Sequence, residues 1–298
     1  MLTLGLILGF CLLTSAIYGF GEQSVPMVQQ DNAPSVDKIL DRMKAHDEWQ
    51  GRYLIEYRAQ RKFSATNLRF KEEATLEVRT TFRRPDTLES EVLRAEGSKI
   101  IRQRVFDKIL EAENEARSKP ARQQIDIVLA NYSFSYLGRE DCAGRECYRL
   151  GITPRRKEKL LIEGQIWVDA EDWGIVRIQG SPAKRPSFWA RQTQIDRRYK
   201  RIDGMWLDDR LESISDVFIA GRSSLMIQYS YESIQTDPQY GIARVFGIPD
   251  YNSVSSAPRP ASTIREELYS ASVCSWQRMH IVAHGTASSP LSLLAWPQ

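Results

Sequence analysis

Apolar and polar residues alternate with a period of two over much of this chain, and that alternation predicts antiparallel β-strands. In residues 68–82 apolar side chains alternate with Arg, Lys and Glu, which is typical of a strand with one buried and one solvated face. Turn sequences such as Asp203-Gly204 separate the segments. The pattern predicts strands at 53–63, 68–82, 87–95, 131–140, 145–152, 159–169, 174–180, 188–202, 205–218 and 223–234.

Two segments change to helical spacing. Ser35 is a capping residue before Val36, Ile39, Leu40 and Met43, which predicts a helix over 36–49. A second helix is predicted over 98–116. Strands and helices do not alternate as βαβ units, so we expect a mainly β (α+β) chain. Its antiparallel meander should form an open, incomplete β-barrel covered by helices.

The chain divides into four predicted parts. Residues 1–21 carry no charged side chain, which predicts a signal peptide, with an uncleaved N-terminal membrane anchor as the alternative. A linker at 22–34, a folded domain at 35–250 and a tail at 251–298 follow. The tail is rich in Ser, Ala and Pro and shows no period, which predicts disorder, with a docking segment as the alternative. We therefore expect export to the periplasm.

The composition excludes several classes of protein. With 42% hydrophobic and 27% charged residues, the chain is neither disordered nor collagen-like. Its 41 basic and 38 acidic residues leave a formal charge of +3, too little to predict a nucleic-acid partner. The runs 155–157 and 197–201 are basic, but nearby acidic residues favour a solvated strand face.

The residues that could carry catalysis are few, and we expect no enzyme. His46 stands alone in the predicted domain, between Ala45 and Asp47, and a surface position is its simplest interpretation. His280 and His284 have the spacing of metal ligands on a helix, but the Glu of a zinc protease motif is absent, so no metal and no cofactor are predicted. A third candidate is the group of carboxylates at Asp169, Glu171 and Asp172, but acidic residues are common in turns and we expect these to form one.

Cys142 and Cys147 form a candidate disulfide. An oxidising compartment favours the bond. The apolar faces of the two flanking strands align only if even-numbered residues pair with even-numbered ones, which would place these two side chains on opposite faces. The sequence therefore leaves both a disulfide and two free thiols possible.

Residues 165–180 (QIWVDAEDWGIVRIQG) resemble the strand–turn–strand segment of the LolA-like family of periplasmic lipoprotein carriers. Residues 182–189 and Gly204-Met205-Trp206-Leu207 strengthen the resemblance, which extends over about 35–235. It implies a lipid-binding half-barrel that carries acyl chains without a cofactor or covalent chemistry. It also implies sorting proteins of the inner and outer membranes as candidate partners, and we expect a monomer.

The main hypothesis is therefore a periplasmic carrier of lipoproteins or lipid acyl chains. The alternative is an envelope-stress regulator of the same fold that contacts a membrane signalling protein. Lid side chains are expected at Ile39, Leu40 and Met43. The alternating apolar positions expected to line a hydrophobic cavity are Tyr53, Ile55, Tyr57, Leu76, Val78, Ile166, Val168, Leu225, Ile227 and Tyr229.

Overall fold

The computed structural model describes residues 33–85, 87–115, 123–185, 190–218 and 220–239, all in one compact unit that begins at Ala33. The predicted signal peptide and tail, and nearly all of the predicted linker, lie outside these residues. Within them, no helix has the length and apolar character needed to cross a membrane.

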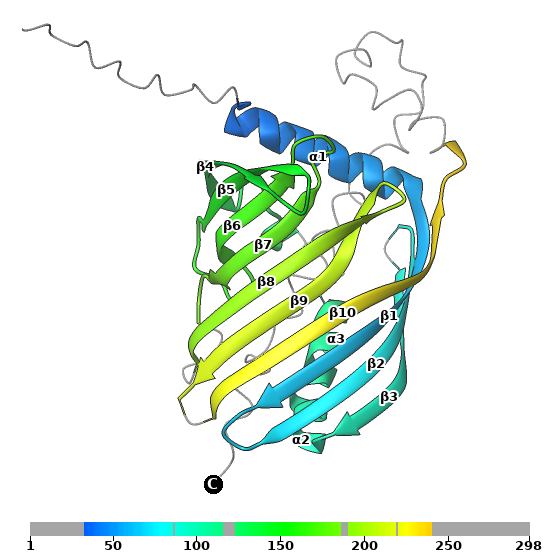
Figure 1. Ribbon diagram of the computed structural model, residues 1–298, viewed down its shortest axis with the longest axis vertical. Helices are drawn as coiled ribbons and strands as arrows, with labels where there is room; N and C mark the ends of the chain where they lie inside the picture. Colours follow the sequence, from blue (N-terminus) through cyan, green and yellow to red (C-terminus); the bar gives the residue numbers. More distant parts are fainter. Residues whose placement is uncertain (1–32, 86, 116–122, 186–189, 219, 240–298) are drawn as a thin grey trace, which may run out of the picture. The chain divides into compact units, whose positions relative to one another are not determined.

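Among the described residues, ten strands make up one antiparallel sheet that does not close into a barrel, which confirms the predicted fold class (Figure 1). The alternation that predicted them continues as an alternation of buried and exposed positions along β1 and β10. The strands are β1 (Leu54–Asn67), β2 (Glu72–Arg83), β3 (Thr87–Gly97), β4 (Tyr132–Asp141), β5 (Glu146–Pro154), β6 (Ile162–Asp169), β7 (Ile175–Pro182), β8 (Ala190–Ile202), β9 (Met205–Val217) and β10 (Gly221–Thr236).

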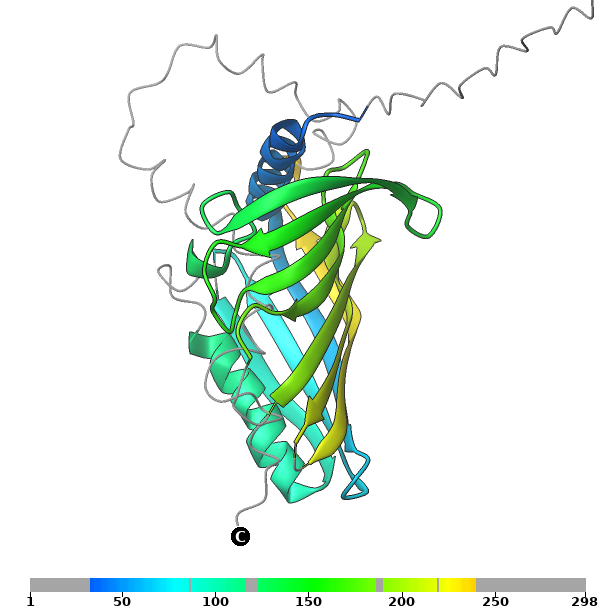
Figure 2. The same ribbon diagram turned by 90° about the vertical axis from the view of Figure 1, so that its left-hand side faces the viewer.

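The strand order departs from a simple meander. It runs β3-β2-β1-β10-β9-β8-β7-β6-β5-β4, so the first strand pairs with the last. Consecutive strands β3 and β4 consequently form the two open edges of the sheet. The connection between them contains the second helical segment, which lies against the hollow side of the curved sheet (Figure 2).

Helices form at both predicted places. α1 (Val36–Tyr53) begins where the Ser35 hydroxyl accepts a hydrogen bond from Lys38 N, at 3.3 Å. It extends further than predicted, so Tyr53 is the last residue of a helix and not the first of a strand. The second segment consists of α2 (Lys99–Ile101), a π-helical turn η1 (Arg102–Phe106) and α3 (Asp107–Glu115). We call residues 99–115 the helical cover.

The buried apolar side chains form three main clusters. The cover cluster joins β1, β2, β9 and β10 to the helical cover through residues such as Val105, Phe106 and Ile109. The α1 cluster joins β4–β9 to α1. A bridging cluster lies around Leu54, Tyr57 and Phe82. The hollow side of the sheet is thus covered by a different helix at each end.

Candidate functional site

The predicted cavity residues lie mostly on the hollow side, but in different clusters. Eight of the ten are buried: Tyr57, Leu76, Val78, Ile166, Val168, Leu225, Ile227 and Tyr229. Five of these meet in the cover cluster: Leu76, Val78, Leu225, Ile227 and Tyr229. Ile166 and Val168 belong to the α1 cluster, and Tyr57 to the bridging cluster.

Two positions depart from the predicted pattern. Tyr53 ends α1 and packs, half-buried, against the bridging cluster. Ile55 is half-buried and belongs to none of the three clusters. The cause is a shift in the β1–β10 register between Leu54 and Glu56, which interrupts the alternation where the helix gives way to the strand.

The predicted lid side chains cover only one part of the hollow. Ile39 and Met43 are buried and Leu40 is partly buried, all against the α1 cluster. The residues over Leu76 and Ile227 come instead from the helical cover, above all Val105, Phe106 and Ile109. Sequence patterning predicted that second helix but did not show which part of the sheet it covers.

A buried ion pair joins the helical cover to the sheet. Arg61 on β1 donates two hydrogen bonds from Nη1 to the Glu113 carboxylate on α3, at 2.8 and 2.9 Å. Both side chains are almost completely buried. Burial opposes the charge of Arg61, but the adjacent Glu113 carboxylate outweighs it and holds the pKa of Arg61 above its usual value.

A second buried ion pair lies two strands away. Arg197 on β8 donates from Nε to Asp208 Oδ1 on β9 at 2.7 Å, and both side chains are buried. Tyr231 donates its hydroxyl to the Asp208 carbonyl at 3.0 Å. Tyr229 lies between the pairs, and burial, reinforced by Asp208, raises its pKa well above the usual value. We call Arg61, Glu113, Arg197, Asp208 and Tyr229 the polar belt.

The polar belt offers buried hydrogen-bond donors. Its tyrosine stays protonated and its arginines stay charged, because the pKa of each is raised above its usual value. Arg61 Nε and Arg197 Nη1 are buried donors without a partner in the described part of the chain. They could bind an oxygen acceptor such as an ester carbonyl.

The prediction that residues 197–201 form a solvated strand face is only partly right. Arg198 and Arg201 are exposed, but Arg197 and Tyr199 are buried. Their parity matches that of Ile195, which is also buried. An arginine at the same parity as an inward apolar residue is consistent with a buried charge, but the sequence does not identify its partner.

His46 is buried on α1, so the predicted surface position is wrong. It lies next to Trp49, with ring centroids 5.7 Å apart. One turn further on, Gln50 Nε2 donates to the Trp206 carbonyl at 3.0 Å, and Trp206 N donates to Gln50 Oε1 at 2.8 Å. Burial lowers the pKa of His46 to about 4, against the opposing effect of Asp172. The imidazole is therefore neutral at pH 7.

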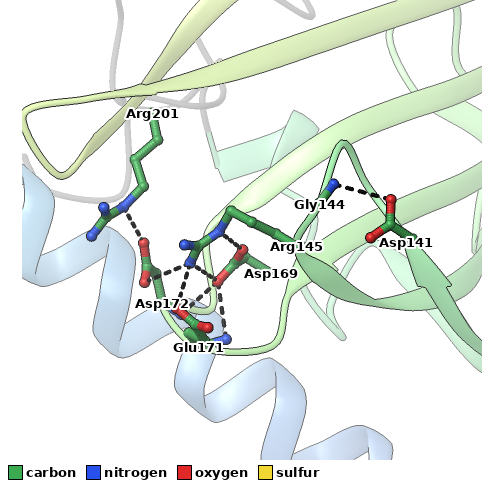
Figure 3. A network of polar contacts seen from close by, with 7 residues as sticks. All are labelled: Asp141, Gly144, Arg145, Asp169, Glu171, Asp172 and Arg201. Atoms are coloured by element: carbon green, nitrogen blue, oxygen red, sulfur yellow. Dashed lines mark hydrogen bonds and ion pairs between the residues drawn. The ribbon is translucent and has the colours of Figure 1, made fainter.

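The three acidic residues of the β6–β7 turn belong to an ion-pair network near α1 (Figure 3). Asp169 Oδ1 accepts hydrogen bonds from the backbone of Glu171 and Asp172, at 2.9 and 2.7 Å, which confirms the predicted turn geometry. Arg145 binds Asp169 through two nitrogens and also contacts Glu171 and Asp172. Arg201 pairs with Asp172. The carboxylates are neutralised by arginines and serve to hold the turn.

Cys142 and Cys147 are free thiols on the same face of the β4–β5 hairpin. Even residues pair with even ones up to Tyr136↔Leu150, as predicted. A register shift between Tyr136 and Gly138 then pairs Glu140 with Cys147. The argument that the side chains face apart is therefore wrong, because Cys147 pairs with Glu140, two residues before Cys142. Burial raises the pKa of both thiols.

We expect an oxidant to join these two thiols. Digestion of the folded, oxidised protein followed by mass spectrometry should yield a cross-linked peptide containing both residues. Cys142→Ser supplies the control, because it should leave Cys147 available to an alkylating reagent after unfolding. Recovery of both native residues in alkylated form after oxidation would contradict the prediction.

No group of three or more potential metal ligands occurs among the residues that the structure describes. The candidate ligands His280 and His284 lie outside those residues.

Comparisons with known proteins give fold similarity only. No protein-family profile and no curated protein matches the sequence. A DUF1329 family protein from Desulfovibrio piger is 13% identical with a TM-score of 0.33, covering 74% of this chain and 99% of the other. A domain assigned as an outer membrane lipoprotein-sorting protein from Vibrio parahaemolyticus is 9% identical with a TM-score of 0.33, covering 78% and 97%.

A LolA superfamily protein from Nitrosomonas europaea is 11% identical, with a TM-score of 0.30, and the match covers 69% of this chain and 94% of that one. At these identities the similarity says nothing about what the present chain binds.

Proposed function

We propose that this protein is a periplasmic carrier or binding protein that holds the acyl chains of lipids or lipoproteins in the hollow of its half-barrel, without covalent chemistry. The observation that carries the proposal is the cover cluster. There, a continuous apolar surface on four strands is covered by a short helical segment rather than by a second sheet.

In the cover cluster, the contacts between the helical cover and the strands are apolar, and this allows an acyl chain to take the place of the cover on the strand surface. The hydrophobic effect depends on the area removed from water and not on direction, so an acyl chain can replace Val105, Phe106 and Ile109 on the same strand surface. The cover also contains the π-helical turn η1, a rare conformation that is often found at functional sites. We therefore assign the ligand to the apolar surface of strands β1, β2 and β10 on which the cover packs.

Two groups of the residues predicted from the sequence fit this proposal. Leu76, Val78, Leu225, Ile227 and Tyr229 would contact the ligand directly. Ile39, Leu40 and Met43 would act as lid side chains only over Ile166 and Val168, because α1 packs on that part of the sheet.

We expect that Leu76→Asp or Ile227→Asp abolishes lipid co-purification, since each places a charge on the proposed binding surface. Mass spectrometry of lipids extracted from the natively purified protein is the measurement. Val92→Asp is the matched control, because Val92 is an apolar strand residue that is 53% exposed on edge strand β3.

Ala65→Leu separates loss of binding from loss of folding. It adds volume to the cover cluster without charge, and we expect less bound lipid in a chain that still unfolds cooperatively. Unchanged lipid content in folded variants would reject the proposal. A pulldown that recovers a membrane signalling protein from lipid-free samples would favour the regulator instead.

A further inference from the structure

Three large apolar side chains are exposed together at one end of the sheet. Leu68 and Phe70 lie in the β1–β2 turn and are 66% and 37% exposed. Phe218 follows the last residue of β9 and is 58% exposed. The alternation in 68–82 placed Leu68 and Phe70 on a buried strand face. The structure corrects this, because β2 begins only at Glu72.

Hydrogen bonds join the two turns into one surface. The buried Asn67 donates from Nδ2 to the Ala220 carbonyl at 2.9 Å and to Ser223 Oγ at 2.8 Å. Its Oδ1 accepts from Phe70 N at 2.9 Å. Leu68 N donates to the Arg222 carbonyl at 3.1 Å. These bonds place Leu68, Phe70 and Phe218 at the same end of the sheet. Figure 1 shows the β1–β2 and β9–β10 turns at that end.

Basic residues alternate with these apolar ones. The first turn reads Leu68-Arg69-Phe70-Lys71, and all four residues are exposed. Arg222 follows the second turn, and the Arg191 guanidinium lies 4.7 Å from the Phe218 ring centroid. The acidic residues Glu72, Glu73 and Asp216 lie on the adjoining strands and not in the turns. The turns themselves are thus basic and apolar.

We propose that this rim docks on a lipid bilayer that contains anionic phospholipids. Leu68, Phe70 and Phe218 would enter the boundary between headgroups and acyl chains, while Arg69, Lys71 and Arg191 reach the phosphates. A lipid surface fits better than a protein partner because Lys is depleted from the centres of protein interfaces, whereas Lys71 lies directly beside Phe70. The inference does not depend on the proposed carrier function.

Flotation with vesicles tests the docking surface. The full-length chain should float with vesicles of phosphatidylcholine and phosphatidylglycerol. Leu68→Ser combined with Phe218→Ser should weaken binding by about tenfold or more, because both side chains lose their apolar contact with lipid. Arg69→Glu combined with Lys71→Glu should remove the preference for phosphatidylglycerol. Val92→Ser combined with Leu129→Ser is the control, since these residues are 53% and 50% exposed elsewhere and should have no effect.

Hydrogen exchange separates binding through the two turns from binding of the apolar N-terminal segment to the vesicles, because it reports on each region of the chain. Amides at 67–72 and 220–223 should exchange more slowly with anionic vesicles, and those at 90–94 should not change. Identical flotation of the rim and control variants, together with unchanged exchange at both turns, would overturn the proposal. Cross-links from position 68 to a protein, in the absence of vesicle binding, would also overturn it. Failure of the carrier function would appear separately, as an absence of co-purified lipid.

Discussion

Glu113→Gln is expected to lower the free energy of unfolding by about 3–5 kcal/mol, because it leaves the Arg61 guanidinium buried without its counter-charge. The two side chains are 1% and 3% exposed, so water cannot replace the lost carboxylate. Urea denaturation followed by circular dichroism measures the change.

A matched exposed pair and a double variant isolate the cause. Glu91→Gln breaks the Arg79–Glu91 pair on β2 and β3, whose side chains are 38% and 67% exposed, and should cost only about 0–1 kcal/mol. Arg61→Met combined with Glu113→Leu should recover most of the loss, because no charge then remains buried. A Glu113→Gln protein as stable as Glu91→Gln would show that the helical cover does not depend on this pair.

The stability of the protein should fall by about 3 kcal/mol between pH 6.5 and pH 4 through His46 alone. Burial lowers the pKa of His46 from 6.5 to about 4 in the folded state. In this range His46 therefore binds a proton in the unfolded chain but not in the folded chain. The free energy of unfolding consequently decreases as pH falls. Below about pH 4 both states are protonated and the loss levels off.

Carboxylates lose their contribution in a lower range, which separates the two effects. Burial opposes the ionisation of Asp169 and Asp196, but Arg145 and Arg177 outweigh it and hold the pKa of each carboxyl below 3.8. Their stabilisation is present above the unfolded pKa and is lost only as pH falls through the folded pKa. Titration between pH 6.5 and pH 4 thus reports mainly on the histidine.

Denaturation curves at several pH values check this prediction with two variants. His46→Phe keeps an aromatic ring beside Trp49 and His46→Asn keeps a polar group, and neither side chain titrates. Both should flatten the pH dependence between 6.5 and 4, whatever their absolute stability. An equal slope in the native protein and in both variants would contradict the assignment to His46.

The local sequence pattern predicted the strands well, because the burial of one face of a strand is visible in the alternation of its own apolar and polar residues. A sheet with one solvated face needs polar side chains at every second position, so β1, β2 and β10 were visible without knowledge of their partners. The same rule failed where the local register changes. Leu68 and Phe70 continue the alternation of β2 but occupy a turn, and the bulge near Leu137 reverses the parity that separated Cys142 from Cys147.

The candidate site was predicted in part. The apolar surface at Leu76, Val78 and Ile227 follows from period two alone. Arg61 and Arg197 were missed because a charged residue at an inward position looks like an interruption of the pattern unless its partner is known. Arg61 has that partner on α3, a helix separated from β1 by two strands.

By itself, the sequence determined a mainly β chain with two helical segments, because alternation and helical spacing are local consequences of burying one face of each element. Only the tertiary structure decided that β1 pairs with β10, that β3 and β4 are the open edges, and which helix covers which part of the hollow. These features rest on contacts between distant segments. Their free energy depends on packing and on ion pairs such as Arg61–Glu113, which no local pattern records.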